Sequence, residues 1–209
     1  MGKSSRLFSY GSKKGGITMT EKKGIHWSIQ IIIIIAFVFI LRTFIFGTIT
    51  VKGSSMEPNF QHGDFVIVNK LAYHIGKPQK GDVAICWLDS GNRKENIIKR
   101  VIGVPGDEID MRLKEEGWDW EYVLYVNGEE QKEDYIPEIM QQPGTIEYPF
   151  IVKENCYFVM GDNRNASTDS REATVGAIPK ENIKGKVVFR LYPFEEMGVI
   201  KNTEKGDKK

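Results

Sequence analysis

A lysine stands inside an apolar, strand-like run, where residues 95–107 read ENIIKRVIGVPGD. Side chains alternate along a strand, so Ile97, Lys99 and Val101 would share one face. An edge strand whose cation reaches water is one explanation. The other is a desolvated lysine, whose pKa is lowered because burial disfavours the charged form and whose neutral amine can accept a proton. This second interpretation requires a nucleophile elsewhere in the chain.

Ser55 is the candidate nucleophile, within the stretch VKGSSMEPNF. A serine hydroxyl attacks poorly until a base removes its proton. Lysine provides that base only when neutral, and in water its pKa of about 10.4 keeps it charged at pH 7. Burial of Lys99 among apolar neighbours would lower that pKa, so Lys99 could act as the base for a nucleophile such as Ser55. A Gly-Ser-Ser sequence is also a common turn, so the hypothesis depends on both residues.

A third stretch, GDNRNASTDSR at 161–171, concentrates charged and hydroxyl side chains. It does not fit a calcium-binding loop, because Arg164 stands where an oxygen ligand is needed and no glycine occupies the sixth position. A solvated polar loop is the plain alternative to a functional one. Asn165 and Ser167 also fit a glycosylation sequon, a pattern short enough to arise often by chance.

An apolar segment precedes all three stretches. Between Trp27 and Phe46 only Arg42 is charged, and about 20 apolar residues can cross a bilayer as a helix. Residues 1–24 hold six basic side chains and one acidic one, which favours a cytoplasmic N-terminus and an exported remainder. A cleaved signal peptide fits less well, because its apolar part is shorter and a small-x-small cleavage site follows directly. We therefore expect an uncleaved membrane anchor.

The remainder reads as short strands, rich in β-branched and aromatic residues and separated by Gly-Asp or Pro-Gly-Asp turns. Asn127-Gly128 after an apolar run is a strong hairpin signal. With no βαβ alternation and no repeat, the pattern predicts a mostly antiparallel β domain, with residues 129–150 as a polar surface excursion. The predicted strands are 48–51, 64–70, 82–88, 96–104, 122–126, 156–160 and 186–192.

The fold class expected from these parts is mostly β: a single N-terminal transmembrane helix followed by an antiparallel β catalytic domain. Four segments follow along the chain. They are a basic cytoplasmic tail (1–24), a transmembrane anchor (25–47), an exported catalytic domain (48–200) and a charged tail (201–209).

Composition excludes several classes of function. The chain has 29 basic and 28 acidic residues, so no nucleic-acid partner is expected. There is no C-x-x-C pair and there are three histidines, so no zinc site is expected. Cys86 and Cys156 both lie in strand-like runs, and either a disulfide or two free thiols is consistent with that placement.

Three of these stretches, in this order behind an anchor, resemble the signature boxes of a type I signal peptidase: GSSMEP, KRVIGVPGD and GDNRNASTDSR. A fourth, KPQKGDVAI, is similar to the short Lys/Arg-Gly-Asp-Val box of that family, and VVFRLYPFEEMG is similar to its closing strand. The resemblance covers roughly residues 30–198 and is nearest to Gram-positive members. Any one box is modest support, whereas four in order are specific.

The resemblance implies a role for each matching residue. Ser55 matches the nucleophile, Lys99 the general base, and Ser167 a hydroxyl that orients the lysine. Gly53 matches an oxyanion-hole position at which some members carry a serine, so that second donor is missing here. The residues that match site-bracing positions, through ion pairs and hydrogen bonds, are Asp162, Arg164, Asp169 and Arg171.

The resemblance also implies the activity. A plasma-membrane serine endopeptidase with an extracytoplasmic catalytic domain would remove signal peptides from exported preproteins by acyl transfer, with no metal and no cofactor. Its substrates would carry small-x-small residues before the cut and would add as an extended strand to the β domain. Preproteins and the lipid bilayer are the expected partners, and the enzyme is expected to act as a monomer near the secretion translocase.

The sequence departs from the family pattern in three places. Many members carry an acidic residue where Asn165 stands, and residues 172–175 lengthen the segment after the third box. The chain between Asp107 and Cys156 is short, which predicts that it lacks the large second domain of some Gram-negative members.

Three other functions fit parts of the sequence. His62 could serve as the base, with Asp64 to orient it, in a different serine hydrolase. A membrane-anchored chaperone or pilus-assembly factor could keep the β fold, but such a relative should lack the serine or the lysine. A self-cleaving repressor would share the serine–lysine pair, but it would need a DNA-binding half in place of the anchor.

Overall fold

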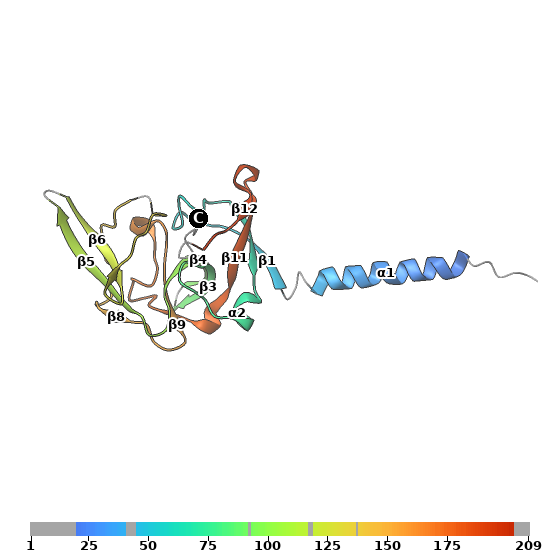
Figure 1. The fold of residues 1–209 in the computed structure, drawn as a ribbon, viewed down its shortest axis with the longest axis horizontal. Coiled ribbons are helices and arrows are strands. Elements are labelled where there is room, and N and C mark those ends of the chain that lie inside the picture. Colours follow the sequence, from blue (N-terminus) through green and yellow to red (C-terminus); the bar gives the residue numbers. More distant parts are fainter. Residues whose placement is uncertain (1–19, 41–44, 92, 117–118, 137, 203–209) are drawn as a thin grey trace, which may run out of the picture. The chain divides into compact units, whose positions relative to one another are not determined.

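The computed structural model describes residues 20–40, 45–91, 93–116, 119–136 and 138–202. One compact unit contains helix α1 (Thr20–Ile40), and a second contains every other described element (Figure 1). Within these ranges no helix is both long enough and apolar enough to cross a membrane. Three parts of the predicted segments lie outside the described residues: the basic tail before residue 20, residues 41–44 of the predicted anchor and the tail beyond residue 202.

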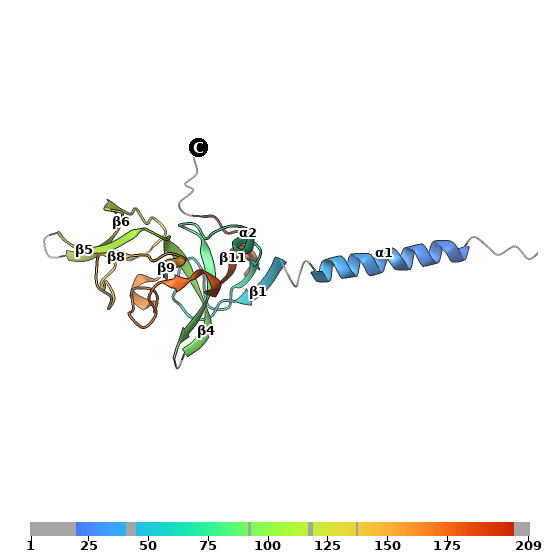
Figure 2. The ribbon, with the colours of Figure 1, turned by 90° about the horizontal axis from the view of Figure 1, so that it is seen from below.

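The larger sheet of the second unit has eight described strands, and every pairing in it is antiparallel. β3 and β4 form a long hairpin in the middle of the sheet, joined in register from Val83↔Arg100 to Ser90↔Arg93 (Figure 2). The spatial order is β1 (Phe46–Thr50), β2 (Phe65–Asn69), β11 (Ile183–Tyr192), β3 (Val83–Ser90), β4 (Arg93–Gly103), β9 (Cys156–Met160) and β10 (Ile178–Pro179), and β12 (Gly198–Val199) pairs with β11.

A smaller antiparallel sheet lies at one end of the same unit (Figure 1). Its described strands, in spatial order, are β7 (Glu129–Glu130), β6 (Asp119–Val126), β5 (Glu108–Glu116) and β8 (Phe150–Ile151). The short helices among the described residues of this unit are α2 (Ala72–Ile75), η2 (Arg164–Ala166), η3 (Lys180–Asn182) and η4 (Phe194–Glu196).

β4 is held from both faces by apolar packing. Ile98 belongs to one buried cluster, together with Met56 and Phe60 from the segment that carries Ser55. Val101 belongs to a second cluster, and Ile102 to a third that fills the space under the smaller sheet. Buried aliphatic side chains on both faces of β4 therefore fix the position and orientation of the strand that carries Lys99.

The prediction of a mostly antiparallel β domain is confirmed, with changes in detail. β1 and β4 begin two and three residues earlier than predicted, at Phe46 and Arg93. The hairpin at Asn127-Gly128 is confirmed: both residues have positive φ, 54° and 80°, as a tight turn of the I′ kind requires. Both cysteines are free thiols, and burial raises the pKa of Cys86 to about 12.

The segment between Asp107 and Cys156 differs most from expectation. β5 was not among the predicted strands, and it builds the smaller sheet together with β6. Residues 129–150, predicted as a surface excursion, carry β7 at their start and the first residue of β8 at their end. Part of this segment turns back onto the stretch 161–171.

Candidate active site

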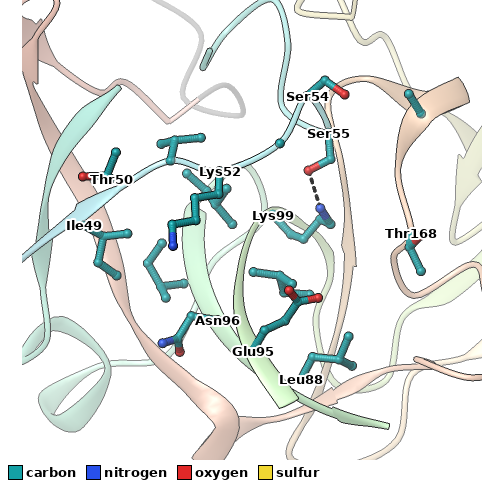
Figure 3. Close-up of a pocket in the computed structure, with 16 residues that line it drawn as sticks. Ile49, Thr50, Lys52, Ser54, Ser55, Leu88, Glu95, Asn96, Lys99 and Thr168 are labelled. Atoms are coloured by element: carbon teal, nitrogen blue, oxygen red, sulfur yellow. Dashed lines mark hydrogen bonds between the residues drawn. The ribbon is translucent and has the colours of Figure 1, made fainter. Parts of the chain in front are cut away.

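A hydrogen bond joins the two residues that the sequence singled out. Lys99 Nζ lies 2.6 Å from Ser55 Oγ, and Figure 3 shows the two side chains turned toward each other. Lys99 is only 3% exposed, whereas Ser55 is half-buried. A hydroxyl at this distance from a buried amine can pass its proton directly to that amine when the amine is neutral.

The β3–β4 hairpin determines the surroundings of Lys99. Lys99 is opposite Ala84, whose small side chain is fully buried, and Ile97 is opposite Cys86. Val101, on the same face of β4, is also fully buried. Burial raises the pKa of the Cys86 thiol to about 12, so this face of the sheet disfavours charged groups.

The segment that carries Ser55 is held from two sides. Asn163 donates from its backbone N–H to the Ser55 carbonyl (3.1 Å) and from Nδ2 to the Ser54 carbonyl (3.3 Å). Gly53 has φ +88°, a conformation that favours glycine, and its N–H donates to His62 Nδ1 at 3.2 Å. The position of the nucleophile therefore depends on the loop 161–171 as well as on its own turn.

Gly161 brings Ser167 beside the nucleophile. A Cβ at position 161 would lie 2.3 Å from Ser167 Oγ and 2.3 Å from the Ser55 carbonyl oxygen, so only glycine fits there. The Ser167 Oγ is buried, and the Ser167 side chain contributes to the lowered pKa of Asp169. Its predicted role in orienting Lys99 stays a prediction.

A buried ion pair fixes β4 one residue beyond Lys99. Arg100 donates from Nε to Asp162 Oδ1 (2.7 Å) and from Nη2 to Asp162 Oδ2 (2.6 Å), and both side chains are almost completely buried. Asn59 donates to the same carboxylate at 3.0 Å. Two parallel hydrogen bonds define both the orientation and the distance of the partners, so this pair locks the lysine strand to the loop 161–171.

A second buried pair stabilises that loop internally. Arg171 donates to both carboxylate oxygens of Asp169, from Nε at 2.8 Å and from Nη2 at 2.9 Å. The Gly161 N–H also donates to Asp169, at 2.9 Å. Burial alone would raise the pKa of Asp169, but the hydrogen bonds and charge of Arg171 outweigh it, so the pKa lies below its usual value.

Residues 129–150 supply partners that sequence reasoning missed. Arg164 pairs with Glu133, and the Arg100 guanidinium lies 4.4 Å from the centre of the Tyr135 ring. Arg171 Nη1 reaches the Gln142 carbonyl at 3.4 Å. An acid and an aromatic residue in a predicted surface loop carry no local signal for these contacts, since the arginines that they meet lie far along the chain.

The alternative base does not meet the serine. His62 is exposed and its Nδ1 accepts the Gly53 N–H, while Asp64 accepts a hydrogen bond from the Gln61 N–H and lies 3.3 Å from Arg190. The described geometry thus pairs Ser55 with Lys99. Among the described residues there is also no group of three or more histidine, cysteine or acidic side chains that could hold a metal ion.

A cleft of about 680 Å³ leads to the serine and the lysine. Residues 49–55 form one wall and residues 95–99 the other (Figure 3). A β domain with a serine hydroxyl hydrogen bonded to a buried lysine at the end of such a cleft has the arrangement of a serine hydrolase.

Comparison with known proteins identifies the family. Residues 24–192 match the family described as "Signal peptidase, peptidase S26". The chain therefore belongs to the signal peptidase family, peptidase S26, and is an enzyme of that family. The prediction of a type I signal peptidase is confirmed at this level.

Relatives of known name cover most of the chain. It is 33% identical over 199 residues to "Signal peptidase IB" of Staphylococcus aureus (strain MRSA252), which covers 88% of this chain and 97% of the relative. It is 36% identical over 187 residues to "Signal peptidase I" of Bacillus caldolyticus, covering 84% and 94%. A crystal structure of a signal peptidase I from Enterococcus faecalis V583 is 31% identical and covers 53% of this chain and 96% of that one, with a TM-score of 0.41.

Proposed function

We propose that this chain is a membrane-anchored serine endopeptidase that removes signal peptides from exported preproteins, with Ser55 as nucleophile and Lys99 as general base. The observation that carries the proposal is the 2.6 Å contact between Lys99 Nζ and Ser55 Oγ in a chain that belongs to the signal peptidase family. The near-complete burial of Lys99 supports a neutral amine, since a charged one would be desolvated there.

The reaction is acyl transfer in two halves. Ser55 Oγ bonds to the scissile carbonyl carbon as its proton moves to Lys99 Nζ. The tetrahedral intermediate collapses when Lys99 returns that proton to the leaving amine, and the peptide C–N bond breaks. A water molecule then gives a proton to Lys99 and attacks the acyl ester, which forms a second tetrahedral intermediate. When this intermediate collapses, Lys99 returns the proton to Ser55 Oγ and the new carboxylate is released. No metal or cofactor takes part in any step.

Backbone donors stabilise the oxyanion in this proposal. The Ser55 N–H is the donor that the family resemblance assigns, and Gly53 offers no side-chain donor. The Gly53 N–H is directed to His62, so we assign to Gly53 the turn conformation and not an N–H donor. A set of bracing residues holds Ser55 and Lys99 at reacting distance. These residues are Asp162, Arg164, Asp169 and Arg171, through their ion pairs, and Ser167.

An N-terminal anchor completes the proposal. It is shorter at its end than the predicted span of residues 25–47, because Phe46 and Gly47 pair with β2 in the catalytic domain. Large apolar side chains of α1 from Trp27 to Phe39 are 46–70% exposed, which a bilayer would cover. The described helix α1 covers only part of the predicted anchor, since residues 41–44 lie outside the described ranges. Basic residues before the anchor keep the N-terminus cytoplasmic, so the catalytic domain (48–200) acts outside the cytoplasm at the plasma membrane.

The substrates in this proposal are exported preproteins with small-x-small residues before the cut. An extended chain in the cleft would lie beside β1, the outermost strand of the sheet order, and pair with its edge. The enzyme acts as a monomer near the secretion translocase, binds the lipid bilayer and has no nucleic-acid partner.

Cleavage of a preprotein by the detergent-solubilised full chain tests the proposal. Wild type should release the signal peptide, Ser55→Ala should release none, and the matched control Ser54→Ala should retain cleavage. The side chain of Ser54 points away from Lys99 in Figure 3 and is exposed. Equal cleavage by the Ser55→Ala protein would contradict the proposal.

A further inference from the structure

The cleft carries a carboxylate on the same strand as the lysine. Glu95 and Lys99 both lie on β4, and alternation along the strand places them on one face with Ile97 between them. Figure 3 shows both side chains projecting into the cleft. The Glu95 Oε1 is buried although the side chain as a whole is half-buried. An acidic group inside a cleft that accepts a peptide can select among peptide sequences.

The strand spacing assigns this carboxylate to one substrate position. Four residues of extended chain span about 13 Å, so Glu95 stands about 13 Å from Lys99 along the cleft. A substrate strand with its scissile carbonyl at Ser55 advances by the same distance in four residues. The first, third and fifth residues before the cut then share a face, because side chains alternate. The fifth residue is the one that meets Glu95.

Both walls run in the direction that this assignment needs. Residues 49–53 and 95–99 both approach the catalytic pair with rising residue number, so a substrate that runs toward its cut site lies parallel to both. β9 pairs with β4 only from Arg100 onward, so the edge of Asn96–Ile98 that faces away from β3 borders the cleft. The first residue before the cut then lies beside Ser55 and Lys99, the third lies beside Ile97, and the fifth lies beside Glu95.

A lysine also lines the cleft. Lys52 lines the opposite wall, and it is exposed, so its ammonium can turn to solvent (Figure 3). Two exposed charged groups attract each other weakly, whereas a carboxylate with one buried oxygen attracts a cation more strongly. Glu95 therefore outweighs Lys52 in the choice of a charged substrate side chain.

We propose that Glu95 selects a basic side chain, lysine or arginine, at the fifth residue before the cleavage site. This inference rests on the proposed function, because it assumes that the residues before the cut occupy the cleft. It assigns to the enzyme a charge preference in addition to its selection for small residues nearer the cut.

Competition among three preproteins tests the proposal. They differ only in lysine, alanine or glutamate at the fifth residue before the cut, and kcat/KM is measured with the full-length protein in detergent. Wild type should prefer lysine to alanine by about five- to tenfold, between the values typical of exposed and buried charge pairs. Glu95→Gln should bring that ratio close to one. Glu95→Lys should invert the preference in favour of glutamate, a gain that misfolding cannot produce.

Two controls make the result specific. Glu154→Gln removes an exposed carboxylate before β9 and should keep the wild-type ratio. A lysine moved to the fourth residue before the cut should face away from Glu95, and a lysine placed after the cut should lie outside this wall, so neither should depend on Glu95. Dependence on Glu95 at either of those positions would overturn the assignment.

The outcomes separate this inference from the proposed function. If wild type cleaves all three preproteins at equal rates, the charge preference is wrong while the peptidase activity stands. If wild type cleaves none of them, and a standard preprotein is also untouched, the proposed function itself fails.

Discussion

Substitution of Gly161 by alanine should disable the site although no reacting group is changed. The new Cβ would lie 2.3 Å from the Ser55 carbonyl oxygen and 2.6 Å from Ser167 Cβ. Contacts of a Cβ below 3.0 Å essentially do not occur, so residue 161 and the Ser55 backbone have to separate by about 0.7 Å. The Ser167 hydroxyl can rotate away, but a backbone carbonyl that accepts the Asn163 N–H cannot move without carrying the nucleophile with it.

The size of the effect follows from that displacement. A misplacement of about 1 Å at a reacting centre can cost about 100-fold in rate, so we expect a loss of roughly 30- to 100-fold in kcat/KM for Gly161→Ala. Overpacking of a buried site costs about 1–3 kcal/mol of the free energy of unfolding. In a chain of this length that corresponds to a melting temperature lower by roughly 2–12 °C.

Preprotein cleavage and thermal melting of the purified protein measure both quantities. Gly198→Ala is the matched control, because its Cβ would meet no atom within 4 Å, and it should match wild type in both assays. A Gly161→Ala protein with wild-type kcat/KM would refute the reasoning. It would show that the contact between the loop 161–171 and the Ser55 segment does not position the nucleophile.

Four further predictions follow from the same account. Lys99→Met should lose at least about 100-fold in cleavage yet melt no lower than wild type, because it removes the cost of burying an amine; an unfolded protein in circular dichroism would contradict this. The pKa of Asp169 lies below its usual value of about 3.9, so its ionised form stabilises the fold above that pH, and the stabilisation is lost as pH falls through the lower folded-state pKa. The melting temperature of Asp169→Asn should therefore fall less than that of wild type between about pH 5 and about pH 2, and parallel curves would argue against it. EDTA should leave cleavage unchanged, whereas loss of activity restored by zinc would remove the serine–lysine mechanism. Protease added to intact protoplasts should degrade the catalytic domain, and degradation seen only in inverted vesicles would reverse the proposed topology.

The adjacency of Ser55 and Lys99 was expected from the family boxes, and local physics supported only the lysine. A lysine between buried β-branched residues is costly unless the fold uses it, and a serine shortly after an apolar segment acquires meaning only with a partner. The partners of Arg100 and Arg164 could not be predicted in this way. Glu133 and Tyr135 look like ordinary solvated residues, and only the tertiary fold brings them to the two arginines.

The smaller sheet shows a different limit. β5 alternates charged and apolar side chains, with Ile109 and Met111 buried and Asp110 and Arg112 on the other face, which is the period of a half-buried strand. The alternation by itself indicates a strand, but the many charged residues of this segment favour a loop. The predicted excursion 129–150 contains few β-branched residues, so nothing local indicated that it would fold back on the site.

The central claim is that neutral Lys99 takes the proton from Ser55, and the pH dependence of single-turnover preprotein cleavage tests it most directly. Between about pH 6 and about pH 10, the wild-type rate should rise and then level off, with an apparent pKa well below the 10.4 or so of free lysine. Lys99→Arg should remain inactive throughout, because a guanidinium does not lose its proton in this range. A substantially active arginine variant, or a wild-type rate that is flat over the whole range, would contradict the claim.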